Sequence, residues 1–222
     1  MLLNLREYHR SALEAPDRPL AHALELLARP AIRTVPLAGG DALLASADRT
    51  VEAVVDLQGM GLDGIEEDTA GALHIGAMAT RAALADHPAA RALCSGILAE
   101  GALRWGGSVQ RNRATVGGAV AVAAANDPLI VALLACAARV TLFGRAGPHE
   151  WPLAGFLARR AELLAAPALI IEVAVGRPAA PHGAALANVA RTPADAPIVV
   201  AAAYLERDGE RCCAARLALG GV

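Results

Sequence analysis

The sequence predicts an α+β chain in which helices alternate with short strands and antiparallel strands close the fold. In the first part of the chain, a helical pattern, a strand, a glycine turn and a second strand follow one another. From residue 168 onward, short strand patterns are joined by tight turns. The length of 222 residues suits one medium domain or two small ones.

The N-terminal half is expected to alternate helices and strands. Apolar residues at helical spacing follow a proline that suits a first helical turn, and the strand stretches end near Gly or Asp. A threonine can cap one helix and a proline can open the next. The expected elements are a helix over 20–29, strands over 34–38, 53–57 and 72–77, a short helix after Thr80, and a longer helix from Pro88 to about Leu103.

In the C-terminal half, the sequence predicts one buried helix followed mostly by strands. Asp208-Gly209 is a strong signal for a hairpin turn. The expected elements are a helix over 128–138, a strand over 139–143, a connector over 144–167 with a helix near 153–164, and strands over 169–175, 184–191, 198–205 and 212–219. These patterns divide the chain into a first domain over 1–167 and a small antiparallel domain over 168–222.

Charge and composition exclude several classes of function. The formal net charge is −2, which argues against a basic nucleic-acid-binding surface. All 20 basic residues are arginine, so a lysine Schiff base or a P-loop lysine is excluded. The apolar stretch from Ala114 to Ala138 is rich in Ala and Gly and contains Asn126-Asp127-Pro128, which favours a loop and a buried helix over a transmembrane segment. The N-terminus has no signal-peptide pattern.

The four cysteines predict no metal site. Cys94, Cys136, Cys212 and Cys213 form no C-x-x-C pair and have no histidine at ligand spacing, so zinc sites and Cys-ligated iron–sulfur clusters are not expected. We interpret them as reduced, mostly buried thiols of a cytoplasmic protein. Adjacent Cys212 and Cys213 are expected on opposite faces of a strand.

Two glycine turns are the main candidates for a binding site. Ala38-Gly39-Gly40 follows a strand, and Thr115-Val116-Gly117-Gly118 precedes an apolar run. Successive amides in such turns can form a nest for a diphosphate, although a Gly-Gly pair is more often only a turn. Neither turn matches the Rossmann fingerprint or the P-loop.

The two turns occur within a longer, ordered series of motifs. This series resembles the FAD-binding (medium) subunits of the molybdenum hydroxylases, which include the flavoproteins of aerobic CO dehydrogenase and xanthine dehydrogenase. The RN-x-ATVGG motif is the most specific of the set. The matching segments are Leu37-Ala38-Gly39-Gly40 with Leu43-Leu44, Val55-Asp56-Leu57, His74-Ile75-Gly76-Ala77 with Thr80, Arg111 to Gly118, Ala132 to Ala135 with Ala137, Val189-Ala190-Arg191 with Asp195-Ala196, and Ala215 to Val222.

The resemblance implies a fold and a function. It implies an FAD-binding domain of the p-cresol methylhydroxylase type, made of two α/β subdomains, and a truncated antiparallel sheet like that of the CO dehydrogenase flavoprotein C-terminal domain. The chain would pass electrons from a [2Fe-2S] small subunit, beside a molybdenum-cofactor large subunit, through FAD to NAD or a quinone. The implied cofactor-binding residues are Leu37, Ala38, Gly39, Gly40, Asp41, Ala42, Thr115, Val116, Gly117, Gly118, Ala119 and Asp127.

Several positions depart from the family pattern where the flavin would be held. Asp41 and Ala42 replace neutral polar residues, and Ala119 replaces Asn or Asp. Pro128 stands where the family has an Asp that reaches the ribityl chain, and Asp127 lies one residue early. Lost hydrogen bonds and a carboxylate facing a diphosphate would weaken binding of FAD. The alternatives are therefore a degenerate, flavin-free scaffolding subunit and an unrelated α/β protein that binds a small molecule.

The sequence offers no catalytic acid, base or nucleophile. Arg111 and Arg113 are the best candidates for a charged role, with phosphate or with a partner's carboxylates. The chain also ends directly after a strand pattern, where the family continues with helices. One face of the C-terminal sheet is therefore expected to be apolar and exposed unless a partner covers it.

Overall fold

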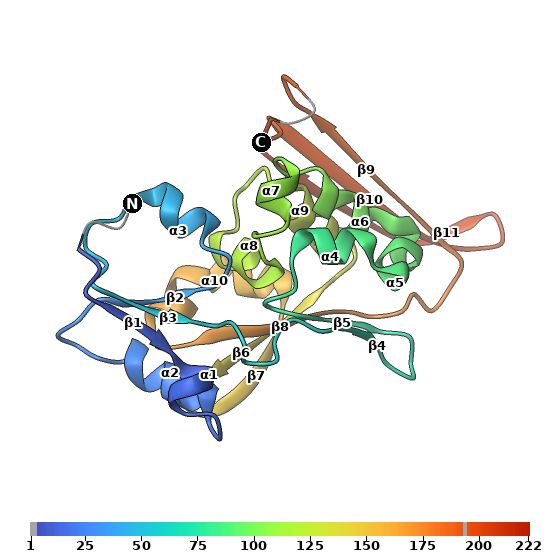
Figure 1. The fold of residues 1–222 in the computed structure, drawn as a ribbon. Coiled ribbons are helices and arrows are strands. Elements are labelled where there is room, and N and C mark those ends of the chain that lie inside the picture. Colours follow the sequence, from blue (N-terminus) through green and yellow to red (C-terminus); the bar gives the residue numbers. More distant parts are fainter. Residues whose placement is uncertain (1–3, 193–194) are drawn as a thin grey trace.

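The computed structural model describes residues 4–192 and 195–222 and contains three separate sheets. The N-terminal and C-terminal sheets lie at opposite ends of the molecule, with most of the helices between them (Figure 1). The first residues of the apolar N-terminal stretch, 1–3, lie outside the described residues. The mixed α and β class expected from the sequence is confirmed.

The N-terminal sheet is a small parallel one with its own core. Its strands are β1 (Glu7–Arg10), β2 (Thr34–Leu37) and β3 (Ala53–Asp56), in the order β1-β3-β2. Helices α1 (Ser11–Glu14), α2 (Pro19–Leu27) and α3 (Asp41–Ser46) connect the strands. Leu24 of α2 packs with Val55 and Leu57 in a cluster that also reaches Leu169, which joins this unit to the next.

The middle unit combines a five-stranded sheet with a group of helices. The strand order is β4-β5-β8-β6-β7, with all pairs antiparallel. The strands are β4 (Ile65–Glu67), β5 (Leu73–Gly76), β6 (Arg139–Gly144), β7 (Gly147–Pro152) and β8 (Leu169–Val175). The helices are α4 (Arg81–Asp86), α5 (Pro88–Ala92), η1 (Leu93–Gly96), α6 (Ile97–Leu103), α7 (Ser108–Arg111), α8 (Val116–Val122), α9 (Pro128–Ala135) and α10 (Leu153–Ala165).

The C-terminal sheet is antiparallel and packs one face on these helices. Its strands are β9 (His182–Val189), β10 (Val199–Asp208) and β11 (Arg211–Gly220), in the order β11-β10-β9. Leu186, Val200 and Tyr204 belong to the same buried cluster as α6 and α9. On the outer face, Leu205 and Leu217 are exposed. The expectation of an exposed apolar face is confirmed.

Two expected elements differ because of contacts between distant segments. The helix expected from Pro88 to Leu103 is broken at Cys94 and Ser95, whose φ angles are 48° and 55°. The Ser95 hydroxyl accepts a hydrogen bond from the Ala184 amide of β9 at 3.1 Å. Docking of β9 at this point accompanies a strained kink that no local signal predicts. The expected connector over 144–167 likewise contains β7 besides its helix.

The strand expected to open the C-terminal unit belongs to another sheet. β8 (Leu169–Val175) pairs with β5 and β6 in the middle unit, so the C-terminal sheet begins with β9. The division of the chain at 167 and 168 stays a prediction, and strand pairing would place such a boundary after Val175. Sheet membership depends on pairing partners far away in sequence, which a strand pattern does not reveal.

Candidate functional site

The first glycine loop lies directly against the second. Gly39 and Gly40 connect the end of β2 to α3, and Gly40 has a φ of 75°, which favours glycine. A Cβ atom on Gly39 would lie 1.7 Å from the carbonyl oxygen of Arg113. Gly39 is therefore required by the close approach of two backbones, whether or not a ligand binds.

The amides of this first loop are available for a ligand. Within the described residues, the N–H groups from Gly39 to Leu43 have no hydrogen-bond acceptor, and no side chain caps α3. Asp41 lies at the start of α3 among these donors. This loop therefore presents the free amides expected from the sequence, with a carboxylate beside them, and their binding of an anion stays a prediction.

The second glycine loop uses its amides within the protein. Thr115 caps α8, and Gly117 packs so closely on Ala77 that a Cβ atom would lie 2.6 Å from the Ala77 methyl. The Val116 amide donates to the Ala79 carbonyl at 2.9 Å, and the Gly117 amide donates to the Ala77 carbonyl at 2.8 Å. The Gly118 amide donates to the Thr115 hydroxyl at 3.1 Å, and the Ala119 amide donates to the Thr115 carbonyl at 2.9 Å. The expectation of a free amide nest in this loop is wrong.

Three cavities meet where the two loops touch. They measure about 380, 480 and 750 Å³, and Ala38 lines all three. The 480 Å³ cavity lies between the two loops and the start of α9, and the 750 Å³ cavity extends from the first loop toward β1 and Arg113. A long ligand could therefore run past both loops from one cavity to the next.

Nearly all of the expected cofactor-binding residues line these cavities. The exception is Val116, which is fully buried in the core beneath the second loop. The residues that do line a cavity are Leu37, Ala38, Gly39, Gly40, Asp41, Ala42, Thr115, Gly117, Gly118, Ala119 and Asp127. Their shared placement is consistent with the expected site, while their contact with a cofactor stays a prediction.

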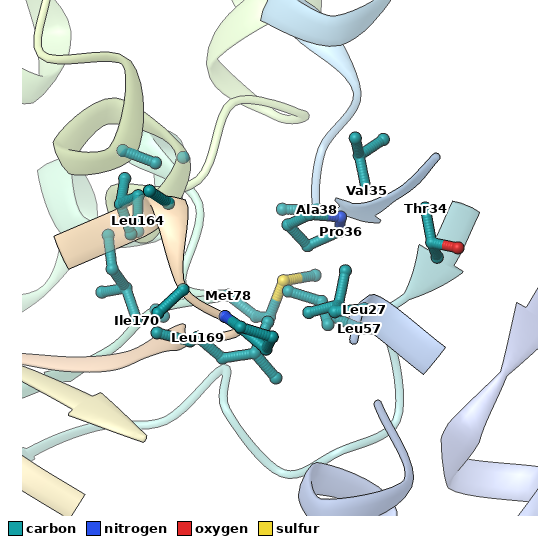
Figure 2. A pocket seen from close by; sticks show the side chains of 18 residues that line it. Leu27, Thr34, Val35, Pro36, Ala38, Leu57, Met78, Leu164, Leu169 and Ile170 are labelled. Carbon is teal, nitrogen blue, oxygen red and sulfur yellow. The ribbon is translucent and has the colours of Figure 1, made fainter. Parts of the chain in front are cut away.

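The 380 Å³ cavity is mainly apolar. Figure 2 shows Leu164, Leu169 and Ile170 on one side of it and Pro36 and Leu57 on the other. The first side comes from the end of α10 and β8, and the second from the N-terminal sheet. An apolar cleft between two units suits a planar aromatic group.

Asp127 is engaged in a buried ion pair inside the 480 Å³ cavity wall. Its carboxylate accepts hydrogen bonds from both terminal nitrogens of Arg81, one of them at 3.0 Å, and from the Leu129 amide at 3.0 Å as the cap of α9. Arg81 and Asp127 are each only 2% exposed. The Asp127 carboxylate therefore accepts most of its hydrogen bonds from within the protein. It is not a free carboxylate that is available to a ribityl chain.

Arg81 is a site residue that sequence reasoning missed. It lines the same cavity, lies 5.0 Å from the centre of the Trp105 ring, and buries an Nε atom without a hydrogen-bond partner. The isolated charge of Asp127 in an apolar stretch signalled that a cation had to be nearby. Nothing in the sequence distinguished Arg81 from the other arginines.

Asn188 and the two candidate arginines, Arg111 and Arg113, have local hydrogen-bond partners. Asn188 accepts a hydrogen bond from Arg104, so it links α6 to β9. Arg113 lines the 750 Å³ cavity and donates weakly to the Gly39 carbonyl at 3.4 Å, whereas Arg111 donates to the Gly106 carbonyl. Arg113 is therefore the better placed of the two expected arginines.

Two kinds of feature are absent from the described residues. Across residues 4–192 and 195–222, no group of three or more His, Cys, Asp or Glu side chains is arranged to hold a metal ion. In the same part of the chain, no helix is both long enough and apolar enough to cross a bilayer.

Comparisons with known proteins agree with this architecture. Among solved structures, the chain is similar to carbon monoxide dehydrogenase from Hydrogenophaga pseudoflava, with 25% identity, a TM-score of 0.85, and coverage of 99% of this chain and 76% of that one. It is also similar to quinoline 2-oxidoreductase from Pseudomonas putida 86, with 28% identity, a TM-score of 0.82, and coverage of 100% of this chain and 75% of that one. For reconstituted CO dehydrogenase from Oligotropha carboxidovorans, the identity is 26%, the TM-score is 0.83, and the match covers 99% of this chain and 76% of that one.

No curated protein sequence matches the chain. A family model described as the FAD binding domain in molybdopterin dehydrogenase matches residues 15–178, which include both glycine loops and all but the start of the N-terminal sheet. The resemblance to molybdenum hydroxylase flavoproteins, and the fold that it implied, are thereby confirmed. The chain belongs to the family of FAD-binding domains of molybdopterin dehydrogenases.

Proposed function

We propose that this chain is the flavoprotein subunit of a molybdenum hydroxylase complex, in which it binds FAD and relays electrons. The observation that carries the proposal is the convergence of three cavities on the two glycine loops, in a chain of the FAD-binding family. When bound, FAD supplies the redox chemistry that the polypeptide side chains lack.

The residues of the cleft fit a dinucleotide. The unpartnered amides from Gly39 to Leu43 suit the diphosphate, because each can donate to a phosphate oxygen. The unpartnered Nε atom of Arg81 in the wall of the 480 Å³ cavity is a further unused donor. The apolar cavity beside Leu169 suits a ring system. Gly117 and Gly118 of the second loop line the cavities without a side chain, whereas their amides are bonded within the protein.

The partners follow from the relatives. The relatives are named as carbon monoxide dehydrogenase and quinoline 2-oxidoreductase, both of which are oxidoreductases. We infer that a molybdenum-cofactor large subunit and a [2Fe-2S] small subunit accompany this chain. NAD or a quinone would then receive the electrons, in the cytoplasm. No catalytic residue is assigned to the chain itself.

Reconstitution with FAD tests the proposal. The purified chain, stripped of any flavin, should quench flavin fluorescence in a stoichiometric titration and acquire a visible flavin absorbance band. Asp41→Asn should tighten binding, because it removes a carboxylate that lines the cavity beside the free amides. Asp208→Asn makes the same charge change at the distant hairpin and should leave the affinity unchanged. A chain that stays colourless and cannot be reconstituted would refute the proposal.

A flavin-free scaffolding subunit is the second candidate. It is favoured by Asp41 beside the free amides, by the Asp127 carboxylate that is already paired with Arg81, and by the exposed apolar face of the C-terminal sheet. Such a chain would co-purify with a molybdenum-type large subunit without flavin. Stoichiometric, tightly bound FAD in that complex would rule the scaffold out.

A further inference from the structure

An irregularity in β11 changes where two adjacent cysteines lie. The pairing of β10 with β11 is regular up to Glu206, which lies opposite Ala214. Arg207 then lies opposite Cys212, so Cys213 is the extra residue of a β-bulge. An extra residue interrupts the alternation of side chains between the two faces of the sheet.

The register places both thiols on the outer face. Leu205 and Arg207 lie two residues apart on β10 and share the outer face, so Cys212, opposite Arg207, lies on that face too. Ala215 lies opposite Leu205, and Cys213, two residues before it, also belongs to the outer face. The expectation that the two cysteines lie on opposite faces is therefore wrong, and the bulge is the reason.

Accessibility distinguishes this pair from the other two cysteines. Cys212 and Cys213 are free and exposed, whereas Cys94 and Cys136 are buried. Two arginines flank Cys212: exposed Arg207 lies directly across from it on β10, and Arg211 precedes it on β11, opposite Asp208. A guanidinium at this position offsets the negative charge that two thiolates bring to one point.

We propose that Cys212 and Cys213 form a dithiol site for soft, thiophilic metal ions and trivalent metalloids. Thiolates are the protein ligands that soft ions prefer, and two on one face can bind a single centre. With an organic arsenic(III) oxide, two As–S bonds form while the arsenic–oxygen bonds break. The oxygen leaves with both thiol protons as water, and no electron is transferred. This site is independent of the flavin cleft.

Titration of the reduced, full-length chain with phenylarsine oxide tests the site. Intact mass should show one arsenic per chain, two thiols should lose reactivity toward an aromatic disulfide reagent, and peptide mapping should locate the adduct at 212–213. Cys213→Ser should weaken binding by about 10²–10⁴-fold, because a second ligand held nearby acts at high effective concentration.

A relocated thiol is the matched control. The double change Cys213→Ala/Ala214→Cys keeps the number of thiols but turns the second one to the inner face, opposite Glu206. It should weaken binding as much as Cys213→Ser does. Wild-type affinity in either variant, or an adduct mapped to Cys94 and Cys136, would overturn the proposal. Both outcomes are independent of whether the chain binds FAD.

Discussion

Replacing Gly39 with alanine separates two reasons for a glycine in the first loop. If Gly39 exists only to let a ligand approach, Gly39→Ala should leave the ligand-free protein as stable as the wild type. The structure indicates otherwise, because the new methyl would lie 1.7 Å from the Arg113 carbonyl oxygen and 2.6 Å from its carbon. Both are backbone atoms, so relief requires the two loops to separate.

The expected cost lies at the upper end of the range for overpacking. Inserting a methyl group into a packed site costs about 1–3 kcal/mol, and we expect about 3 kcal/mol because neither backbone can rotate away. For a chain of this size, that loss lowers the melting temperature by about 6–12 °C. Loop separation would also widen the cleft, so FAD affinity should fall together with stability.

Urea unfolding of the flavin-free chain is the decisive assay. Gly155→Ala is the matched control, because a Cβ at Gly155 in α10 meets no atom within 4 Å. That change should stabilise the chain by about 0.5–1 kcal/mol, as expected for glycine replaced by alanine within a helix. If Gly39→Ala unfolds at the wild-type urea concentration, the loops are not held together as described and the argument from their contact fails.

Two further predictions concern charged groups. Arg81→Met leaves Asp127 buried without its partner and should cost about 3–5 kcal/mol in urea unfolding, with Arg81→Met/Asp127→Asn costing less than the sum of the single changes. The pKa of His74 is raised, chiefly by its hydrogen bond with Glu172 and further by Asp68. These contacts stabilise the folded chain fully at pH values below about 6.5, the pKa of an unfolded histidine, and this stability is lost as the pH rises through the raised pKa of folded His74. His74→Gln should therefore flatten the dependence of the unfolding free energy on pH in that range.

The elements that the sequence predicts well are those that local chemistry determines. Thr80 accepts a hydrogen bond from the Ala83 amide at 3.1 Å and begins α4, as its position before a helical pattern suggested. The hairpin expected at Asp208-Gly209 forms, with its turn one residue later at Gly209-Glu210; Asp208 ends β10 and pairs with Arg211, and Gly209 has a φ of 57°. In each case, the residues that decide the conformation lie within one turn of each other.

The errors arise where distant segments decide the outcome. The kink at Cys94 coincides with the docking of β9, and the sheet to which β8 belongs depends on β5 and β6. The bulge at Cys213 likewise depends on how β11 pairs with β10. Propensity and periodicity cannot reveal these features, because each requires knowledge of which distant backbone lies alongside.

The same limit applies to the site. Both glycine pairs were expected to have one role, yet only the amides that follow Gly39 remain free, while those around Gly117 are bonded to the backbone of Ala77 and Ala79 or to Thr115. A glycine pair that permits two backbones to touch and one that exposes amides to a ligand look identical in sequence. In the proposed function, the affinity for FAD depends mainly on the free amides of the first loop. On that proposal, the charge of Asp41, more than the presence of the glycines, separates a flavoprotein from a scaffold of the same fold.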